Sequence, residues 1–353
     1  MNQKSFIIKS AIACALIFSS CKKDPPGSPQ IQPGNGSIAT SYKVNTFAGN
    51  GTNGNDPQTG GLALLYMPAD LATDAQGNIY VADSYNDKIR KITPSGVMTT
   101  FAGSTLGYED GTGAEAKFNR PTVLALDSHG NLYVGESGGL RIRKITPDGI
   151  VTTIAGNGTA GLVDGVGASA QIDIPGGMVV DAQGNVYFTQ TNFNGIRKIS
   201  PSGVVSTFVG SETPGYAEGT GTAARFNQAF SLVIDAAGYL YVSDNQNARI
   251  RRISPAGVVT TFLKRNSPNE MYNITIDETG NFYIVQGDSN KSEIVQYDTQ
   301  GRINKIAGGE MGYQDGTGDI AKFGYITGMT TDADGALYVS DLFNNVVRKI
   351  QKR

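Results

Sequence analysis

The chain has 353 residues and a formal net charge of −2, with 46 glycines, one histidine and no tryptophan. The glycines follow no Gly-X-Y period, which excludes a collagen-like chain and indicates many turns. The single histidine, His129, excludes a zinc site built from two or more histidines. A chain of this length buries enough surface to fold without a metal or a disulfide.

Residues 1–20 have the pattern of a signal peptide. Lys4 and Lys9 flank an apolar run that is too short to cross a bilayer as a helix. The segment from Phe18 to Cys21 resembles a bacterial lipobox, although an ordinary secretory signal remains the alternative. We therefore expect an exported chain that is lipid-anchored to the cell envelope through Cys21. Residues 21–41, rich in Pro, Gly and Ser, are predicted to form a flexible tether.

Six similar units follow one another from residue 42 to residue 353. Each contains a D-x-x-G turn and a short alternating run, as in TDAQGNIYVAD from residue 73, and continues with a phrase such as KIRKITPSGVMTTFAG from residue 88. The turn aspartates are Asp74, Asp127, Asp181, Asp235, Asp277 and Asp332. Alternation with a period of two, separated by tight turns, predicts four short strands per unit. Such a unit is one blade of a β-propeller.

The two ends of the repeat region predict how the ring closes. The last unit stops at Ile350, after its third strand, whereas the segment from Tyr42 to Gly49 matches the fourth strand of the other units. Pairing these segments removes an exposed sheet edge. We therefore expect an all-β protein, a six-bladed propeller of four-stranded antiparallel blades whose N-terminal strand closes the last blade.

The phrase at residues 78–103, N-I-Y-V-A-D followed by I-R-K-I-T-P-S-G, resembles the NHL-repeat family. The D-G-x-G-x-x-A-x-F connector resembles the bacterial secreted or lipoprotein branch of that family. The resemblance implies a six-bladed propeller that binds other molecules. Some relatives are enzymes, so the fold alone does not decide the function.

A glycine-rich loop recurs before several blades, at residues 107–118, 161–172, 215–226 and 312–323. Each copy offers one acid, too few oxygens for calcium, which takes six or more; the acids are Asp110, Asp164, Glu218 and Asp315. Thr112 to Glu115 fits a capping box instead. The apolar side of the turn is expected to plug the gap between blades through Ala116 and Phe118, Ala223 and Phe226, and Ala321 and Phe323. We interpret the loops as connectors and expect them around the mouth of the central channel.

Two sets of residues are candidates for ligand binding. Tyr108, Tyr216 and Tyr313 share one position of the connector, where a flat ring could stack on a sugar or fold onto its own loop. The link at residues 262–273 is shorter than its counterparts and predicts a notch in the rim, or a harmless deletion. The residues expected near that notch are Lys264, Arg265, Tyr272 and Phe230.

The alternative function is a metal-dependent hydrolase or lyase at the channel mouth. The chain is also similar to gluconolactonase-type propellers, which hold a metal at the channel mouth. The equivalent positions here carry no ligand suited to a hard metal ion, since they are Ala69, Thr122, Gly176, Phe230, Tyr272 and Thr327. A second ring could coordinate Ca²⁺ if it pointed inward, or could merely end the preceding turns; it consists of Asn119, Asp173, Asn227 and Asn269.

Basic pairs recur by blade, at Arg90-Lys91, Arg143-Lys144, Arg197-Lys198, Arg251-Arg252 and Arg348-Lys349. Loss of Lys4 and Lys9 with the signal peptide would change the net charge from −2 to −4, and nucleic-acid binding needs a concentrated positive patch. We therefore expect no nucleic acid and predict that these residues pair with acids of adjacent blades, such as Asp83, Asp244 and Asp341. The function that we expect is non-enzymatic binding or scaffolding by a monomer, without a cofactor. Its partner would be a carbohydrate or an envelope protein at the loop-rich face.

Overall fold

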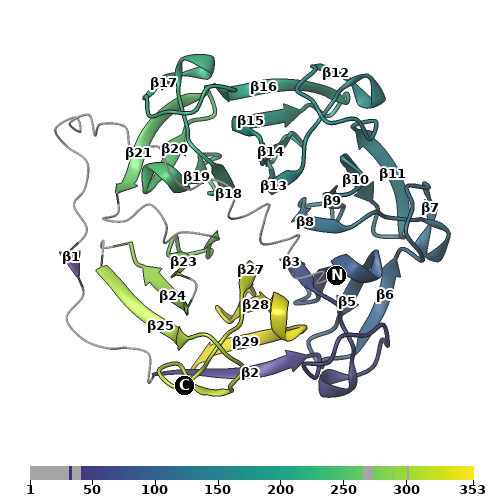
Figure 1. The fold of residues 1–353 in the computed structure, drawn as a ribbon, viewed down its shortest axis with the longest axis vertical. Helices are drawn as coiled ribbons and strands as arrows, with labels where there is room; N and C mark the ends of the chain where they lie inside the picture. The colour runs from purple at the N-terminus through teal and green to yellow at the C-terminus, as the bar shows by residue number, and fades with distance from the viewer. Residues whose placement is uncertain (1–31, 34–40, 265–272, 289, 300–301) are drawn as a thin grey trace.

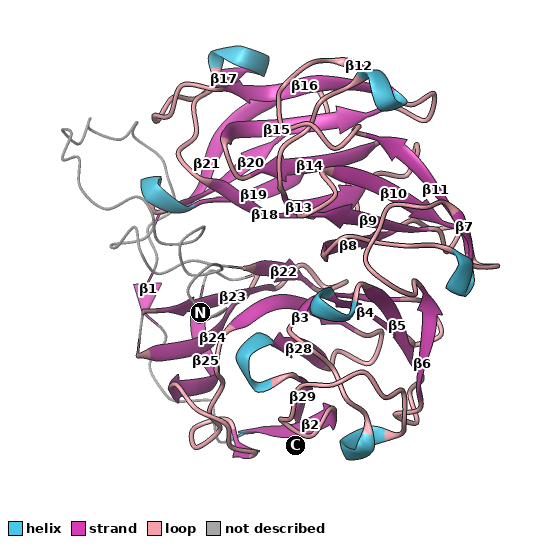
Figure 2. Ribbon diagram, turned by 45° about the vertical axis from the view of Figure 1, so that its right-hand side comes forward, coloured by secondary structure: helices cyan, strands magenta, loops and turns pink. Residues whose placement is uncertain are grey.

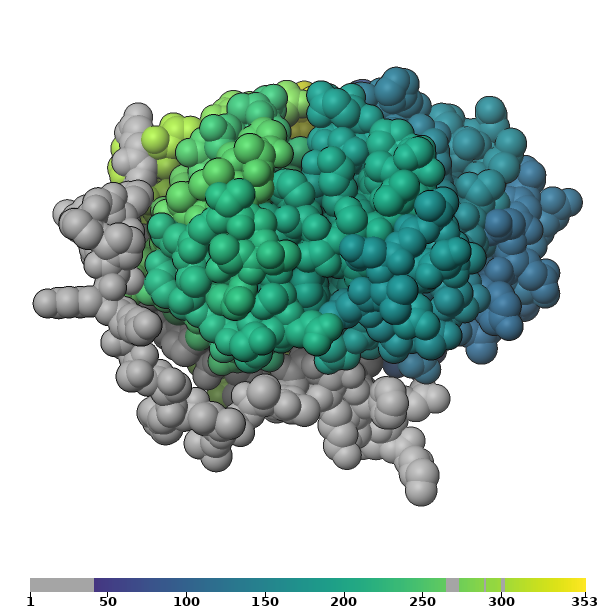
Figure 3. Space-filling model, turned by 90° about the horizontal axis from the view of Figure 1, so that it is seen from above, coloured from purple at the N-terminus to yellow at the C-terminus, as the bar shows by residue number. Residues whose placement is uncertain are grey.

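The computed structural model describes residues 32–33, 41–264, 273–288, 290–299 and 302–353. Six antiparallel sheets are arranged around a central axis as the blades of a propeller (Figure 1). Short 3-10 turns are the helical elements of the described residues, and Figure 2 shows them on the loops. Seen from the edge, the third and fourth blades, which face the viewer, pack against one another without a break (Figure 3). No helix among the described residues is long and apolar enough to cross a membrane.

Each blade has four main strands, which follow one another in order from the axis to the rim. The innermost strands are β3 (Pro68–Thr73), β8 (Pro121–Leu126), β13 (Pro175–Val180), β18 (Ala229–Ile234), β22 (Ile274–Ile276) and β27 (Ile326–Thr331). The second strands are β4 (Ile79–Asp83), β9 (Leu132–Glu136), β14 (Val186–Gln190), β19 (Leu240–Asp244), β23 (Phe282–Gly287) and β28 (Leu337–Asp341). The third strands are β5 (Lys88–Ile92), β10 (Arg141–Ile145), β15 (Phe193–Ile199), β20 (Arg249–Ile253), β24 (Lys291–Tyr297) and β29 (Val346–Lys352). The outer strands are β6 (Met98–Ala102), β11 (Ile150–Ala155), β16 (Val204–Ser211), β21 (Val258–Lys264), β25 (Arg302–Glu310) and β2 (Tyr42–Ala48).

The ring closes as the sequence predicts. β2, from the N-terminal side, pairs antiparallel with β29 and completes the sixth blade, with Val44 opposite Ile350. Residues near the two ends of the chain thus share one sheet, and both ends of the ring region lie at the same blade in Figure 1.

The blades are wider than predicted, because five of the six sheets contain an additional two-residue strand at the rim. The connectors supply four of them, β7 (Gly111–Thr112), β12 (Gly165–Val166), β17 (Gly219–Thr220) and β26 (Gly316–Thr317). Each pairs antiparallel with the outer strand of the blade that follows it, as Gly111 does with Val151. In the fifth blade the place is taken by β1 (Gln32–Pro33), which pairs parallel with β25.

The connectors also fill the spaces between the sheets, as predicted. Thr112 donates its N–H to Glu115 Oε2 at 3.1 Å in the expected capping box. Ala116 and Phe118 are fully buried. One expected residue was wrong, since Ala223 is exposed and its neighbour Ala224 is buried with Phe226 instead. Ala224, not Ala223, corresponds to Ala116 when the two connectors are aligned by their acids.

The D-x-x-G turns have the predicted geometry. Asp74 Oδ1 accepts the N–H groups of Gln76 and Asn78 at 3.0 and 2.8 Å, and Gly77 has a positive φ of 77°. An aspartate of this kind fixes the turn, and glycine tolerates the left-handed conformation. The turn places the second strand directly against the innermost one.

Candidate functional site

The innermost strands surround a cavity of about 650 Å³ on the propeller axis. Aliphatic side chains make up most of its wall, among them Leu71, Val123, Met178 and Leu232. Successive side chains of an innermost strand point to opposite faces of its sheet, so they alternate between the two neighbouring blades. The cavity therefore has the apolar lining and few polar groups that are typical of small-molecule sites.

Asp70 brings a carboxyl group into this wall. Its Oδ2 accepts the N–H of Leu124, in the next blade, at 2.9 Å. On the other side lies Gly328 of the sixth blade, where an added Cβ would stand 2.5 Å from Asp70 Oδ1. Three blades thus meet at one carboxylate, whose side chain stays partly accessible from the cavity.

Burial raises the pKa of Asp70 to about 7, although the N–H groups of Leu124 and Leu71 act in the opposite direction. No ion pair of Asp70 with a lysine, arginine or histidine occurs among the described residues, so the negative charge is unbalanced there. Sequence reasoning missed this residue. The inner-strand ring that the sequence singled out lies one residue earlier, at Ala69 in the first blade. The ring that contains Asp70 consists of Asp70, Val123, Gly177, Ser231, Asn273 and Gly328.

Aromatic rings gather at one end of the cavity, where innermost strands begin and second strands end. Phe230, in β18, is 37% exposed and lines the cavity. Tyr85 and Tyr325 line the same end, and Arg120 lies over the Tyr85 ring at 5.1 Å. We call this end, defined by Phe230, Tyr85, Tyr325 and Arg120, the mouth of the cavity.

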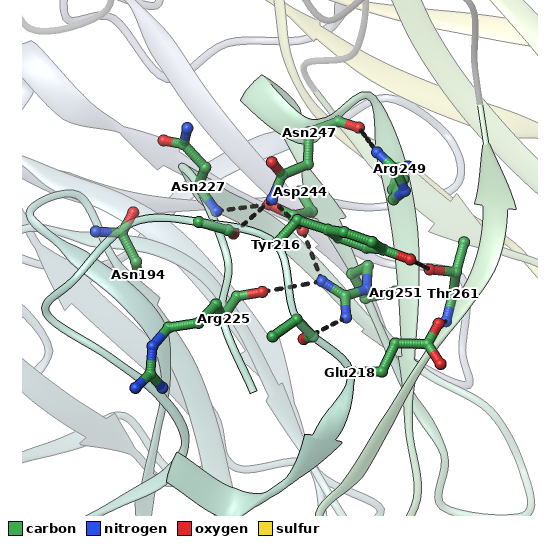
Figure 4. A network of polar contacts seen from close by, with 12 residues as sticks. Asn194, Tyr216, Glu218, Arg225, Asn227, Asp244, Asn247, Arg249, Arg251 and Thr261 are labelled. Atoms are coloured by element: carbon green, nitrogen blue, oxygen red, sulfur yellow. Dashed lines mark hydrogen bonds and ion pairs between the residues drawn. The ribbon is translucent and has the colours of Figure 1, made fainter. Parts of the chain in front are cut away.

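At the rim, buried arginines join the connectors to the blades. Figure 4 shows the fourth blade, where Arg251 donates to Asp244 Oδ2 at 2.9 Å and to the connector carbonyls of Arg225 and Ala217 at 3.0 and 2.9 Å. Glu218 of the connector accepts the N–H of Thr261 in β21 at 2.8 Å. The buried guanidinium group of Arg251 therefore holds the connector against the blade.

The predicted partners of the basic residues need correction. Arg90, Arg251 and Arg348 pair with Asp83, Asp244 and Asp341 of their own blade, not of an adjacent blade. The reason is the strand register, because Arg90 stands opposite Val81 in a second strand that ends at Asp83. The connector acids provide the second partner, at 2.7 Å for Asp110 with Arg143, 2.8 Å for Asp164 with Arg197 and 2.5 Å for Asp315 with Arg348.

Residues 65–92 match the family model of the NHL repeat. They span the first blade from just before β3 to the end of β5, in a ring of six such blades. The chain is an NHL-repeat propeller.

Relatives of this NHL-repeat propeller are much longer proteins or share only its fold. Human Teneurin-4 is 25% identical over 84% of this chain, which covers 13% of the length of Teneurin-4. The chain spans less than a fifth of the first curated relatives that it matches. Among solved structures, a structural genomics protein of unknown function from Bacteroides thetaiotaomicron has a TM-score of 0.66 at 18% identity, covering 88% of this chain and 76% of that one. A gluconolactonase from Xanthomonas campestris has a TM-score of 0.59 at 13% identity, covering 94% of this chain and all of that one.

The connectors of this NHL-repeat propeller lie at the rim, not around the mouth of the channel as expected, because their short strands pair with outer strands (Figure 1). The candidate tyrosines lie there too. The hydroxyls of Tyr216 and Tyr313 are each 3.0 Å from a threonine Oγ1 of an outer strand, Thr261 and Thr46. Arginine guanidinium groups cover their rings, as Arg141 covers Tyr108 at 4.4 Å. Tyr108 and Tyr313 are nevertheless 61% and 46% exposed.

The four residues expected at the notch are not brought together in the described part of the propeller. Phe230 lies in the innermost strand of the fourth blade, and Lys264 ends β21, the outer strand that pairs with β17 in that blade. Arg265 and Tyr272 lie outside the described residues.

The ring considered for Ca²⁺ precedes the innermost strands, and none of its described members lines the cavity. The Asp173 carboxylate accepts hydrogen bonds from Asn192 and from the N–H of Ile174, and the N–H of Asn227 donates to Asp244. Asn119 accepts the Gly138 and Gly139 N–H groups with its carbonyl oxygen, and Asn269 lies outside the described residues. Within the described ranges, no three His, Cys, Asp or Glu side chains gather closely enough to hold a metal ion.

Proposed function

We propose that this NHL-repeat propeller is a non-enzymatic binding protein that takes a small ligand, or the end of a larger one, in its central cavity. The observation that carries the proposal is the cavity of about 650 Å³ with its aromatic mouth at Phe230, Tyr85 and Tyr325. Ligand sites in proteins are typically clefts of roughly 300–1,000 Å³ with apolar walls and a few polar groups.

A carbohydrate is the ligand class that fits this mouth best. Flat aromatic rings pack against the apolar faces of sugars while polar groups at their edge bind hydroxyls. Arg120, stacked on Tyr85, offers a guanidinium group with several donors at the same place. The other partner that we consider is an envelope protein that inserts a loop into the cavity.

The proposed location is the bacterial cell envelope, with the chain held there by a lipid on Cys21 and by the tether at residues 21–41. The support is the lipobox-like segment from Phe18 to Cys21. Cys21→Ser should move the full-length protein from the membrane fraction to the soluble fraction. An unchanged membrane fraction would reject the lipid anchor without affecting the binding proposal.

The binding proposal is tested with the full chain and a panel of neutral oligosaccharides, followed by calorimetry of the best ligand. Phe230→Ala should weaken binding at least tenfold, because it removes the exposed ring of the mouth. Tyr108→Ala removes a ring of similar size and greater exposure at the rim and should leave binding unchanged. The opposite pattern would place the site at the rim tyrosines and reject the cavity.

The same mixtures decide between binding and the hydrolase alternative. Mass spectrometry should recover every ligand unchanged after incubation, with and without added Ca²⁺. A hydrolysed product that depends on Ca²⁺ and disappears in Asp173→Ala would favour the metal-dependent enzyme instead.

A further inference from the structure

Among the described residues, the cavity wall contains one carboxyl group and places no cation within ion-pair distance of it. Asp70 is the only carboxylate among the described residues that line it, and Arg120 is the only lysine, arginine or histidine. Arg120 lies over Tyr85 at the mouth and forms no ion pair with Asp70. Burying a carboxylate without a counter-charge is unfavourable, because the wall cannot solvate it as water does.

Joining neighbouring blades does not explain this charge. Ser231 occupies the same inner-strand position in the fourth blade, and its hydroxyl accepts the N–H of Ile274 in the next blade at 3.1 Å. Asn273, at this position in the fifth blade, also bridges to the next blade, but with the opposite polarity, since its amide donates to the Thr327 carbonyl at 2.8 Å. The neutral Ser231 therefore makes the same kind of contact that Asp70 makes with Leu124. The aspartate adds only a second oxygen and a negative charge.

We propose that the ligand of this cavity carries a protonated amine that pairs with Asp70, while the rest of the ligand packs between Phe230 and the aliphatic wall. This inference rests on the proposed function, because it assigns a chemistry to the same cavity. An ammonium group supplies three donors and the positive charge that the described cavity wall does not place beside Asp70. Its pairing with a carboxylate in low-dielectric surroundings is stronger than the same contact in water.

The test uses pairs of probes that differ only by an amine and a hydroxyl, namely benzylammonium with benzyl alcohol and D-glucosamine with D-glucose. Calorimetry on the full chain at pH 8 should show that the amine of at least one pair binds roughly tenfold or more tightly than its hydroxyl partner. Asp70→Asn should abolish this preference and leave the affinity for the neutral probe unchanged. Asn273 shows that an amide is accommodated at this inner-strand position, and a thermal melt checks that the variant is folded.

Three results would overturn the inference: no amine preference in the wild type, no binding of either amine, or a preference that survives in Asp70→Asn. The proposed function fails differently, when neutral oligosaccharides bind the wild type no better than Phe230→Ala. As a charge control, Asp148→Asn removes an exposed acid outside the cavity and should keep the amine preference.

Discussion

Arg143 and Asp110 form an ion pair with 2.7 Å between Nη2 and Oδ1, which fastens the connector to the third strand of the blade that follows it. The same guanidinium donates from Nη1 to Glu136 of its own blade at 2.7 Å. Burial raises the pKa of Glu136 to about 7 despite this arginine. Each such arginine is therefore a joint between a sheet and a loop, and its side chain has no contact with solvent.

Removing one joint should destabilise the propeller strongly. Arg251→Met leaves the buried Asp244 carboxylate without its counter-charge and removes the hydrogen-bond donor of two connector carbonyls. The expected loss in the free energy of unfolding is about 3–5 kcal/mol, measured by urea denaturation. Arg302→Met breaks an exposed ion pair with Asp298 and should cost less than about 1 kcal/mol. Equal losses of stability in the two variants would contradict the claim that the buried arginine stabilises the propeller.

The plug between blades should matter as much as the joint. Phe118 is fully buried, so Phe118→Ala leaves a cavity and should cost about 3–5 kcal/mol in the free energy of unfolding. Leu106, which immediately precedes the same connector, is 62% exposed, and Leu106→Ala should cost less than about 0.5 kcal/mol. A small effect of Phe118→Ala would mean that the connector is not part of the cooperative core.

Asp70 should make stability depend on pH. Burial raises its pKa from 3.8 to about 7, so between these values the folded protein binds a proton that the unfolded chain releases. Stability conferred by the protonated form is therefore lost as the pH rises from about 4 to about 7. Asp70→Asn should exceed the wild type by on the order of 3 kcal/mol at pH 8 and match it at pH 4. Urea midpoints across this range measure the difference, with Asp148→Asn as the exposed control; parallel curves for wild type and Asp70→Asn would disprove it.

The space beside Asp70 should be sensitive to a single methyl group. A Cβ at Gly328 would lie 2.5 Å from Asp70 Oδ1 and 2.6 Å from its Cα. Gly328→Ala must therefore displace the carboxylate or the strand and should cost about 1–3 kcal/mol. Gly61, whose added Cβ would contact nothing within 4 Å, provides the matched substitution, and Gly61→Ala should be nearly neutral. Thermal melts of the two variants decide the comparison.

Local periodicity was sufficient to predict the ring, because each blade repeats the same turn and strand pattern in the chain. The closure followed from the match of the Tyr42 segment to a fourth strand, and the burial of Phe118 from its place on a capped turn. These features depend on residues that are close in sequence, or on one unit compared with another.

The site depends on contacts that no local pattern encodes. Asp70 lies between Leu124 and Gly328, which come from two other blades and are separated from it by 54 and 258 residues. The sequence shows an aspartate in the first inner strand. Its burial, and the lack of a counter-charge among the described residues, depend on the assembled ring. The rim position of the tyrosines also depended on assembly, because the connector strands pair with the blade that follows them.

The pairing of β1 with β25 would tie the fifth blade to the lipid anchor that we propose on Cys21. Gln32 follows Cys21 by 11 residues, a length of chain that spans at most about 40 Å when fully extended. A lipid on Cys21 would therefore keep the outer edge of the fifth blade close to the bilayer surface.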